Sequence, residues 1–207
     1  MKNLFYNQKV YPAKLQRSGG FTLVEVIVAV FILTMSIGGL LSLAAGGFYS
    51  VRYARNQIVA NNLLQESLEY VRNTRDTSVI GGLSFQNWQD TLKVDVNGNQ
   101  TGGVNSGCFN QYGCIVDPYS ISPAIKQCSG TCPSILYYPD NEFYGYSASY
   151  PFSSVSSPYQ TSFNRTIKVS ESATNPDQVI VTGTITWLNG SVTKSLTQSV
   201  LLTNWTP

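Results

Sequence analysis

The sequence Gly19-Gly20-Phe21-Thr22-Leu23-Val24-Glu25 opens an apolar run that continues to Tyr49. Glu25 is the one charged side chain between Gly19 and Ser50. A helix that crosses a bilayer needs roughly 20 apolar residues, and this run is longer. A carboxylate deep in hydrocarbon costs about 2.5–3.5 kcal/mol, so it persists mainly where a partner neutralises it. The stretch therefore predicts a membrane span whose single acid has a partner.

Charge is sparse in this chain and unevenly placed. Charged residues make up 12% of the 207 residues, against about 25% in a typical soluble domain. The first 20 residues hold four basic side chains and no acid, namely Lys2, Lys9, Lys14 and Arg17. The remainder holds nine basic residues against 11 acids, so it has no basic excess that would favour nucleic acid. The sequence therefore predicts no nucleic-acid partner.

The segment 1–20 has the character of a cytoplasmic leader. It is polar, contains Pro12 and ends in Ser18-Gly19-Gly20, which disfavours a helix interior. The positive-inside rule keeps this end in the cytoplasm and sends the C-terminal side across the membrane. A secretory signal cut near Leu43-Ala44-Ala45 is the alternative. Its apolar core would be about twice the usual 7–15 residues and would contain Glu25.

A single helix is predicted from Phe21 to about Asp76, because no proline interrupts this range. Residues 21–50 are its transmembrane part, apolar all round as lipid or a helical bundle would require, and residues 51–76 are an amphipathic continuation. Helical spacing places four apolar side chains of the second part on one face: Ala60, Leu64, Leu68 and Val71. That stripe predicts packing against the chain's own head rather than a ligand site.

The segment 77–207 predicts a β-rich head, because short alternating runs are separated by Gly, Asn, Ser and Pro. The clearest unit is a hairpin around Asn189-Gly190, a dipeptide typical of two-residue primed turns. With that turn, Trp187 faces Val192. A third strand is expected at Phe163, Ile167 and Val169. The fold class is therefore α+β, with a long N-terminal helix against an antiparallel sheet.

A loop-rich region, about 98–162, contains all four cysteines: Cys108, Cys114, Cys128 and Cys132. An even number of clustered cysteines is expected to form disulfides if the head reaches an oxidising compartment. A four-thiolate zinc site is the alternative, although C-x5-C and C-x3-C depart from the usual C-x2-C spacing. Among the three connectivities we expect neighbours to pair, Cys108 with Cys114 and Cys128 with Cys132.

The same region contains two short candidate strands, near Ile135–Tyr138 and Phe143–Ser147. Its tyrosines either form a binding surface or cover a small irregular core. Asp140 and Glu142 flank Asn141 but lack the ligand series and glycine of a calcium-binding loop, so we interpret them as solvated charges. No metal or other cofactor is predicted. Because the chain has no histidine and the head only scattered acids, we do not predict an enzyme.

The N-terminal pattern resembles that of the type IV pilins and pseudopilins, the subunits of type IV pili and of secretion and DNA-uptake filaments. The matching features are a short basic leader ending in Gly20, then Phe21, Thr22-Leu23-Val24, Glu25 and the apolar run. The resemblance is strong over roughly residues 17–50, whereas the head is similar only in being β-rich.

The resemblance implies that a prepilin peptidase cuts between Gly20 and Phe21 and methylates the new amino group of Phe21. Glu25 would then neutralise the Phe21 amino group of a neighbouring subunit, because either charge alone is costly to bury. The implied partners are that peptidase, other pilin subunits, an inner-membrane assembly platform and the membrane. The implied location is a single pass through the inner membrane with the head outside, followed by an extracellular or periplasmic filament.

Two functions remain open from the sequence. The first is a structural filament subunit, and the Val-Ile-Val-Ala-Val-Phe-Ile-Leu composition of residues 26–33 favours a minor pilin or pseudopilin. The second is a membrane-anchored surface adhesin or DNA-binding module that does not join a filament. Filament assembly distinguishes them, since only the first function requires the N-terminal helices of many copies to pack together.

Overall fold

The computed structural model describes residues 19–120, 123–139, 142–146, 158–172, 174–175 and 177–205. Its helices are α1 (Leu23–Ile80), α2 (Phe85–Thr91) and the short 3-10 helix η1 (Gly107–Phe109). Its strands are β1 (Cys114–Val116), β2 (Ile125–Gln127), β3 (Ser134–Tyr138), β4 (Phe143–Gly145), β5 (Tyr159–Glu171), β6 (Gln178–Asn189) and β7 (Val192–Thr203). The α+β class is confirmed. The chain divides into two compact units, Met1–Phe48 and Tyr49–Pro207, and α1 contributes to both.

Helix α1 begins at Leu23 and ends at Ile80, a few residues beyond the predicted end near Asp76. A glycine pair ends it. Gly82 has a φ of 81°, and its N–H donates to the Val79 carbonyl while the Leu83 N–H donates to the Ser78 carbonyl. These two bonds form a Schellman motif, in which a left-handed residue satisfies the last helical carbonyls.

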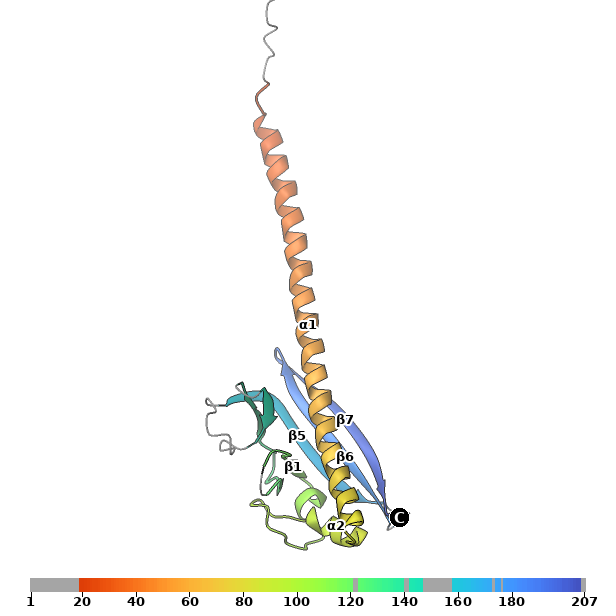
Figure 1. Ribbon diagram of the computed structural model, residues 1–207. Coiled ribbons are helices and arrows are strands. Elements are labelled where there is room, and N and C mark those ends of the chain that lie inside the picture. The colour runs from red at the N-terminus through yellow and green to blue at the C-terminus, as the bar shows by residue number, and fades with distance from the viewer. Residues whose placement is uncertain are drawn as a thin grey trace, which may run out of the picture. The chain divides into compact units, whose positions relative to one another are not determined.

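The long strands β5, β6 and β7 form the main part of an antiparallel sheet (Figure 1). The edge of β5 away from β6 pairs with two short strands in succession. β1 meets it at Ile167, and β3 pairs with it between Tyr159 and Asn164. β2 and β4 extend the sheet beyond β1 and β3. The region expected to be loop-rich therefore supplies four strands, including the two anticipated ones.

The predicted register of the terminal hairpin is wrong by two residues. Trp187 pairs with Lys194 rather than Val192, because Asn189 is still in β6 and pairs with Val192. The two-residue loop is Gly190-Ser191, and Gly190 takes the positive φ of 65° that the first loop position of a type II′ turn requires. A shift of two residues leaves every side chain on its predicted face.

Within the second unit, α1 lies across one face of β5, β6 and β7 (Figure 1). The predicted stripe is confirmed, since Ala60, Leu64, Leu68 and Val71 are all buried in the core. The helix approaches the sheet closely at Gly183 of β6. A Cβ added there would lie 2.5 Å from Cδ1 of Leu64, so a side chain at this position would collide with α1.

Arg165 of β5 joins three elements and was not anticipated from the sequence. It is 2% exposed, and its guanidinium donates to the Leu63 carbonyl of α1 and the Val116 carbonyl of β1. It also forms an ion pair with Glu66 at 3.1 Å. The guanidinium lies 5.6 Å from the ring centre of Tyr146. Burial raises the pKa of that phenol, and the arginine charge opposes the rise.

Two disulfides hold the loops around β1 and β2. Cys108 is bonded to Cys114, and Cys128 to Cys132, which are the neighbour pairings expected from the sequence. The first bond lies in the main core cluster, whereas the second lies with Ile115 in a smaller cluster.

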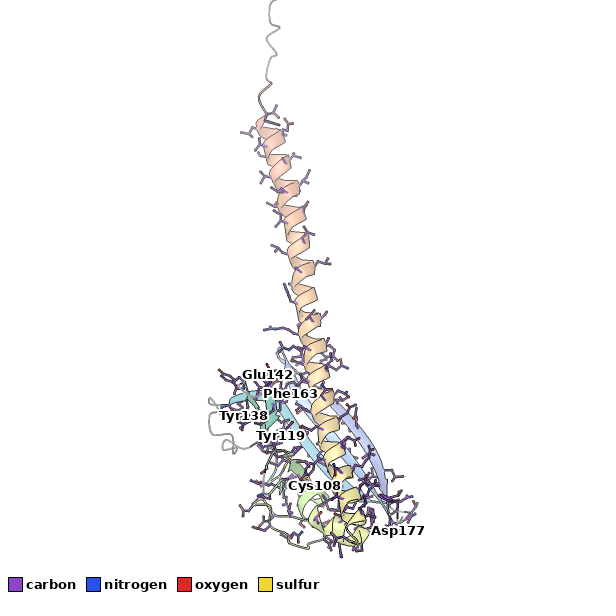
Figure 2. The ribbon with its side chains drawn as sticks, in the orientation of Figure 1. Cys108, Tyr119, Tyr138, Glu142, Phe163 and Asp177 are labelled. Atoms are coloured by element: carbon purple, nitrogen blue, oxygen red, sulfur yellow. A yellow bond between two sulfur atoms is a disulfide. The ribbon has the colours of Figure 1, made fainter. Side chains whose placement is uncertain are left out.

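The tyrosines near β3 and β4 mainly cover the core. Tyr138 is 1% exposed, and its ring stacks on that of Phe143 with centres 4.5 Å apart. Tyr119 also packs on Phe143, with ring centres 5.1 Å apart. Figure 2 shows Tyr119, Tyr138 and Phe163 in the same part of the head. These contacts favour a packed aromatic cluster over a binding surface.

Asp140, one of the two acids interpreted above as solvated charges, lies outside the described residues.

Candidate processing and assembly site

The peptide bond between Gly20 and Phe21 lies outside any helix or strand, just before α1. Both residues are exposed, and the relative exposure of Phe21 is 81%. Apart from its two chain neighbours, no heavy atom of the described residues comes within 4 Å of a Cβ built on Gly20. A peptidase could therefore reach this bond without first unfolding a helical turn.

Thr22 caps the helix that follows. Its side-chain oxygen accepts a hydrogen bond from the Glu25 N–H at 3.3 Å, and its carbonyl accepts one from the Val26 N–H at 3.2 Å. A threonine followed three residues later by glutamate is the sequence signature of a capping box. The helix dipole also favours a carboxylate in the first turn. The cap therefore places Glu25 one turn from Phe21, and the T-x-x-E pattern would have allowed this start to be predicted.

The first part of α1 offers no buried face. Every side chain from Leu23 to Phe48 is exposed, and Glu25 has no ion pair among the described residues. The most apolar 18-residue window of α1 has a mean hydropathy of 2.5 and is 0% buried. By length and composition α1 is able to span a membrane. An apolar surface of this extent needs lipid or other helices to cover it.

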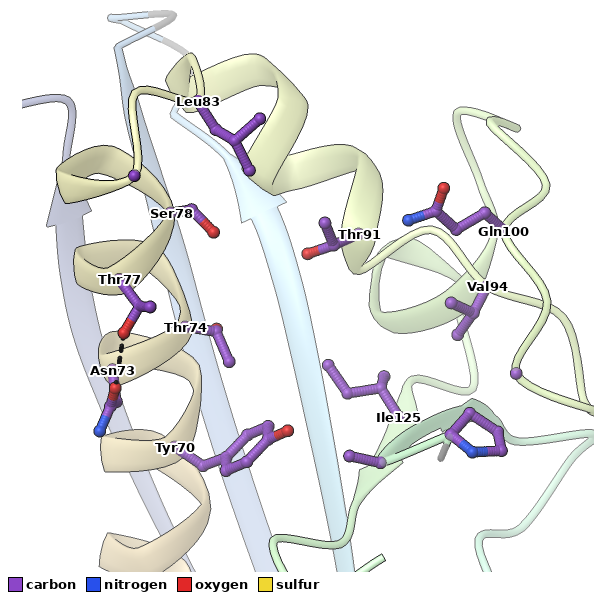
Figure 3. A pocket seen from close by; sticks show the side chains of 14 residues that line it. Tyr70, Asn73, Thr74, Thr77, Ser78, Leu83, Thr91, Val94, Gln100 and Ile125 are labelled. Atoms are coloured by element: carbon purple, nitrogen blue, oxygen red, sulfur yellow. Dashed lines mark hydrogen bonds between the residues drawn. The ribbon is translucent and has the colours of Figure 1, made fainter. Parts of the chain in front are cut away.

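A hollow of about 610 Å³ lies beside the end of α1 in the second unit (Figure 3). Tyr70, Thr74 and Ser78 of α1 form one side, and Val94 and Ile125 lie opposite. Burial, and secondly the charge of Asp117, raises the pKa of Tyr70. Among the described residues that line it there is no carboxylate, amine or thiol, so they offer apolar contact and neutral hydrogen bonds.

An accessible bond before a capped helix, one acid in the first turn and an uncovered apolar helix ahead of an α+β head define a pilin-like precursor. A comparison with protein families supports this class. Residues 15–45 match the prokaryotic N-terminal methylation motif, the signal of type IV pilins and pseudopilins. The chain therefore carries the signal that prepilin peptidase processes. No curated protein and no solved structure matches the chain. The match includes Gly20, Phe21 and Glu25, and it ends before the head.

Proposed function

We propose that this protein is a structural subunit of a type IV pilus or a type II secretion-like filament, as a minor pilin or pseudopilin. Prepilin peptidase removes residues 1–20 and methylates the amino group of Phe21. The observation that carries the proposal is the exposed apolar surface of Leu23–Phe48, most of which lies within the match to the methylation motif at residues 15–45. Helices of other subunits would cover that surface in a filament, as lipid would cover it before assembly.

Glu25 is the proposed assembly contact. Its carboxylate lies in the first turn of α1, the turn that a cut after Gly20 would leave next to the new amino group. A buried ion loses several kcal/mol of hydration, and an opposite charge at close range offsets much of this loss. The Phe21 amino group of a neighbouring copy is the proposed counter-ion, and this pairing would fix the axial register between helices.

The proposed location follows from the basic leader and the apolar helix. The leader stays in the cytoplasm, the first part of α1 crosses the inner membrane, and the head lies outside until the subunit joins the filament. The expected partners are the peptidase, other pilin subunits and an assembly platform in the inner membrane.

Replacing Glu25 by alanine tests the proposal. We expect the Glu25→Ala variant to be processed and inserted normally, but to enter sheared filament fractions at least about tenfold less, since an uncompensated buried charge costs about 3–5 kcal/mol. Glu69→Ala is the matched control, because Glu69 is an exposed acid of the same helix paired only with Arg72 among the described residues. Normal incorporation of Glu25→Ala would exclude the pairing. Absence of the wild-type chain from all filament fractions would favour an adhesin or DNA-binding module anchored singly in the membrane.

A further inference from the structure

A second hollow, of about 370 Å³, lies between α1 and the turn of the terminal hairpin. Arg52, Arg55 and Asn56 line it from α1, and Asn189 lines it from the end of β6. Phe163, labelled in Figure 2, forms part of its apolar wall. The described residues of its lining contribute two guanidinium groups and no carboxylate, so their chemistry favours an anion.

The two arginines are available to bind a ligand. Neither Arg52 nor Arg55 has an ion pair or a side-chain hydrogen bond among the described residues, and both side chains are exposed. The charge of Arg55 also acts on Tyr144, which lines the hollow. Burial and Tyr137 raise the pKa of Tyr144, and Arg55 opposes that rise. The two residues are three positions apart on one helix, so they lie on the same face.

Asn189 adds a buried donor to this wall. The residue is 5% exposed, and its side-chain amide nitrogen is buried without a hydrogen-bond partner among the described residues. A buried polar group left unpaired costs about 1–3 kcal/mol, so such groups generally have an explanation. β6 holds Asn189 in place through its pairing with Val192. Because Asn189 lines the hollow, an acceptor oxygen that reached its amide from there would satisfy this donor.

We propose that this hollow binds the phosphate group of an anionic phospholipid before the subunit leaves the membrane. The planar fork of arginine suits phosphate oxygens, and the amide of Asn189 supplies a neutral donor. Arg52 and Arg55 are the first charged residues after Glu25, two and five positions past Ser50. At 1.5 Å per residue they lie within about 8 Å of the end of the apolar run. This is the depth of a headgroup layer, roughly 5–8 Å per leaflet.

The lipid source rests on the membrane anchoring of the proposed function, whereas the phosphate chemistry rests on the hollow itself. The full chain in detergent micelles is mixed with phosphatidylglycerol, phosphatidylcholine, a phosphate-free galactolipid or inorganic phosphate, and bound molecules are counted by native mass spectrometry. The test variant is Arg52→Gln/Arg55→Gln. The control is Arg72→Gln/Lys168→Gln, which removes the same charge from exposed positions outside the hollow.

We expect phosphatidylglycerol to be retained best, because the choline of phosphatidylcholine would lie near the arginines. Each arginine contributes about fivefold near an anionic lipid, so the test variant should bind about 30-fold more weakly. The control should bind normally, and Asn189→Ala should give an intermediate loss. Unchanged tryptophan fluorescence melting would show that each variant is folded.

Three results would overturn the inference. Equal retention of the galactolipid would mean that acyl chains alone are recognised. Saturation by inorganic phosphate without any lipid preference would assign the hollow to a free anion. An equal loss of phosphatidylglycerol binding in the control variant would mean that binding depends only on the net charge of the protein. None of these results depends on leader removal or filament assembly, so the proposed function could stand if the lipid site fails, and the reverse also holds.

Discussion

The two parts of α1 differ in what their apolar side chains contact. From Leu23 to Phe48 every side chain is exposed, whereas the part after Tyr49 buries Ala60, Leu64, Leu68 and Val71 in the core of the head. The first part is apolar all round, and the second is apolar on one face. One helix therefore has apolar surfaces with two different partners. The second part packs in the core of its own head, and the first needs lipid or other helices to cover it.

Changes in the first part are therefore expected to alter processing or assembly without destabilising the head. Changes in the second unit should destabilise the head without altering processing. The chain offers a selective probe, because all three tryptophans lie after residue 80, at positions 88, 187 and 205. Thermal unfolding followed by tryptophan fluorescence thus reports on the head.

The largest effect is expected for Gly20→Val. Because no described atom beyond its two chain neighbours lies within 4 Å of the Gly20 Cβ position, the substitution should leave the fold unchanged. Leader removal should nevertheless stop, since the proposed cut directly follows this glycine. Intact-mass measurement of membrane fractions should find only the precursor. Gly19→Val is the matched control in an equally open position, and it should still be cut. A Gly20→Val chain starting at Phe21 would contradict the cut site.

Arg165→Met is expected to have the largest effect on the head. It removes a buried cation that bonds to the carbonyls of Leu63 and Val116 and leaves Glu66 without its partner. Breaking a buried ion pair from one side costs about 3–5 kcal/mol, so the fluorescence melting temperature should fall steeply. Leader removal should be unaffected.

Arg72→Met is the control for Arg165→Met. Its ion pair with Glu69 is exposed, and such pairs contribute about 0–1 kcal/mol. Equal melting of the two variants would show that Arg165 does not join α1 to the sheet.

A smaller loss is expected when the first disulfide is removed. The double variant Cys108→Ala/Cys114→Ala opens a loop with a sequence separation of 6. Loop-closure entropy for so short a loop corresponds to about 2 kcal/mol, and the buried position of both sulfurs adds a little more. The single variant Cys108→Ala serves as a comparison, since it should lose the same cross-link and leave a buried thiol at Cys114 that a reagent labels only when the head unfolds. A double variant that melts like the wild type would show that the loops are held by packing alone.

The processing site and the packed stripe of α1 could both be predicted from the sequence, because each depends on residues that are close together in the chain. Glycine, phenylalanine and glutamate in register with an apolar run form a local pattern, as do apolar residues at helical spacing. Arg165 was missed because its charge indicates a surface position. Its alternation with Phe163 and Ile167 nevertheless places it on the buried face of β5.

The rest of the head depended on contacts between distant residues. β1 and β2 have three residues each and become strands only because they pair with each other and β1 also pairs with β5. The hairpin register could not be decided by hydrophobic pattern, because a shift of two residues keeps both faces unchanged. Asn189-Gly190 and Gly190-Ser191 are both acceptable loops. The structure has the Gly190-Ser191 loop, and with this loop Asn189 is 5% exposed in the folded head.

The smallest effect is expected at Gly183, where the second part of α1 comes closest to the sheet. Gly183→Ala would place a methyl group 2.5 Å from Cδ1 of Leu64 and 3.1 Å from Cδ1 of Ile167. Both atoms are side-chain ends, so they can shift, and overpacking of this kind costs about 1–3 kcal/mol. Leu64→Ala alone should cost more, about 2–5 kcal/mol, because it leaves a cavity. In the double variant the new methyl occupies part of that space. Its loss of stability should therefore be smaller than the sum of the losses of the two single variants. A double-mutant cycle of fluorescence melts would measure this coupling. Strict additivity would mean that α1 does not rest on β6 at this point, and the contrast between the two parts of the helix would weaken accordingly.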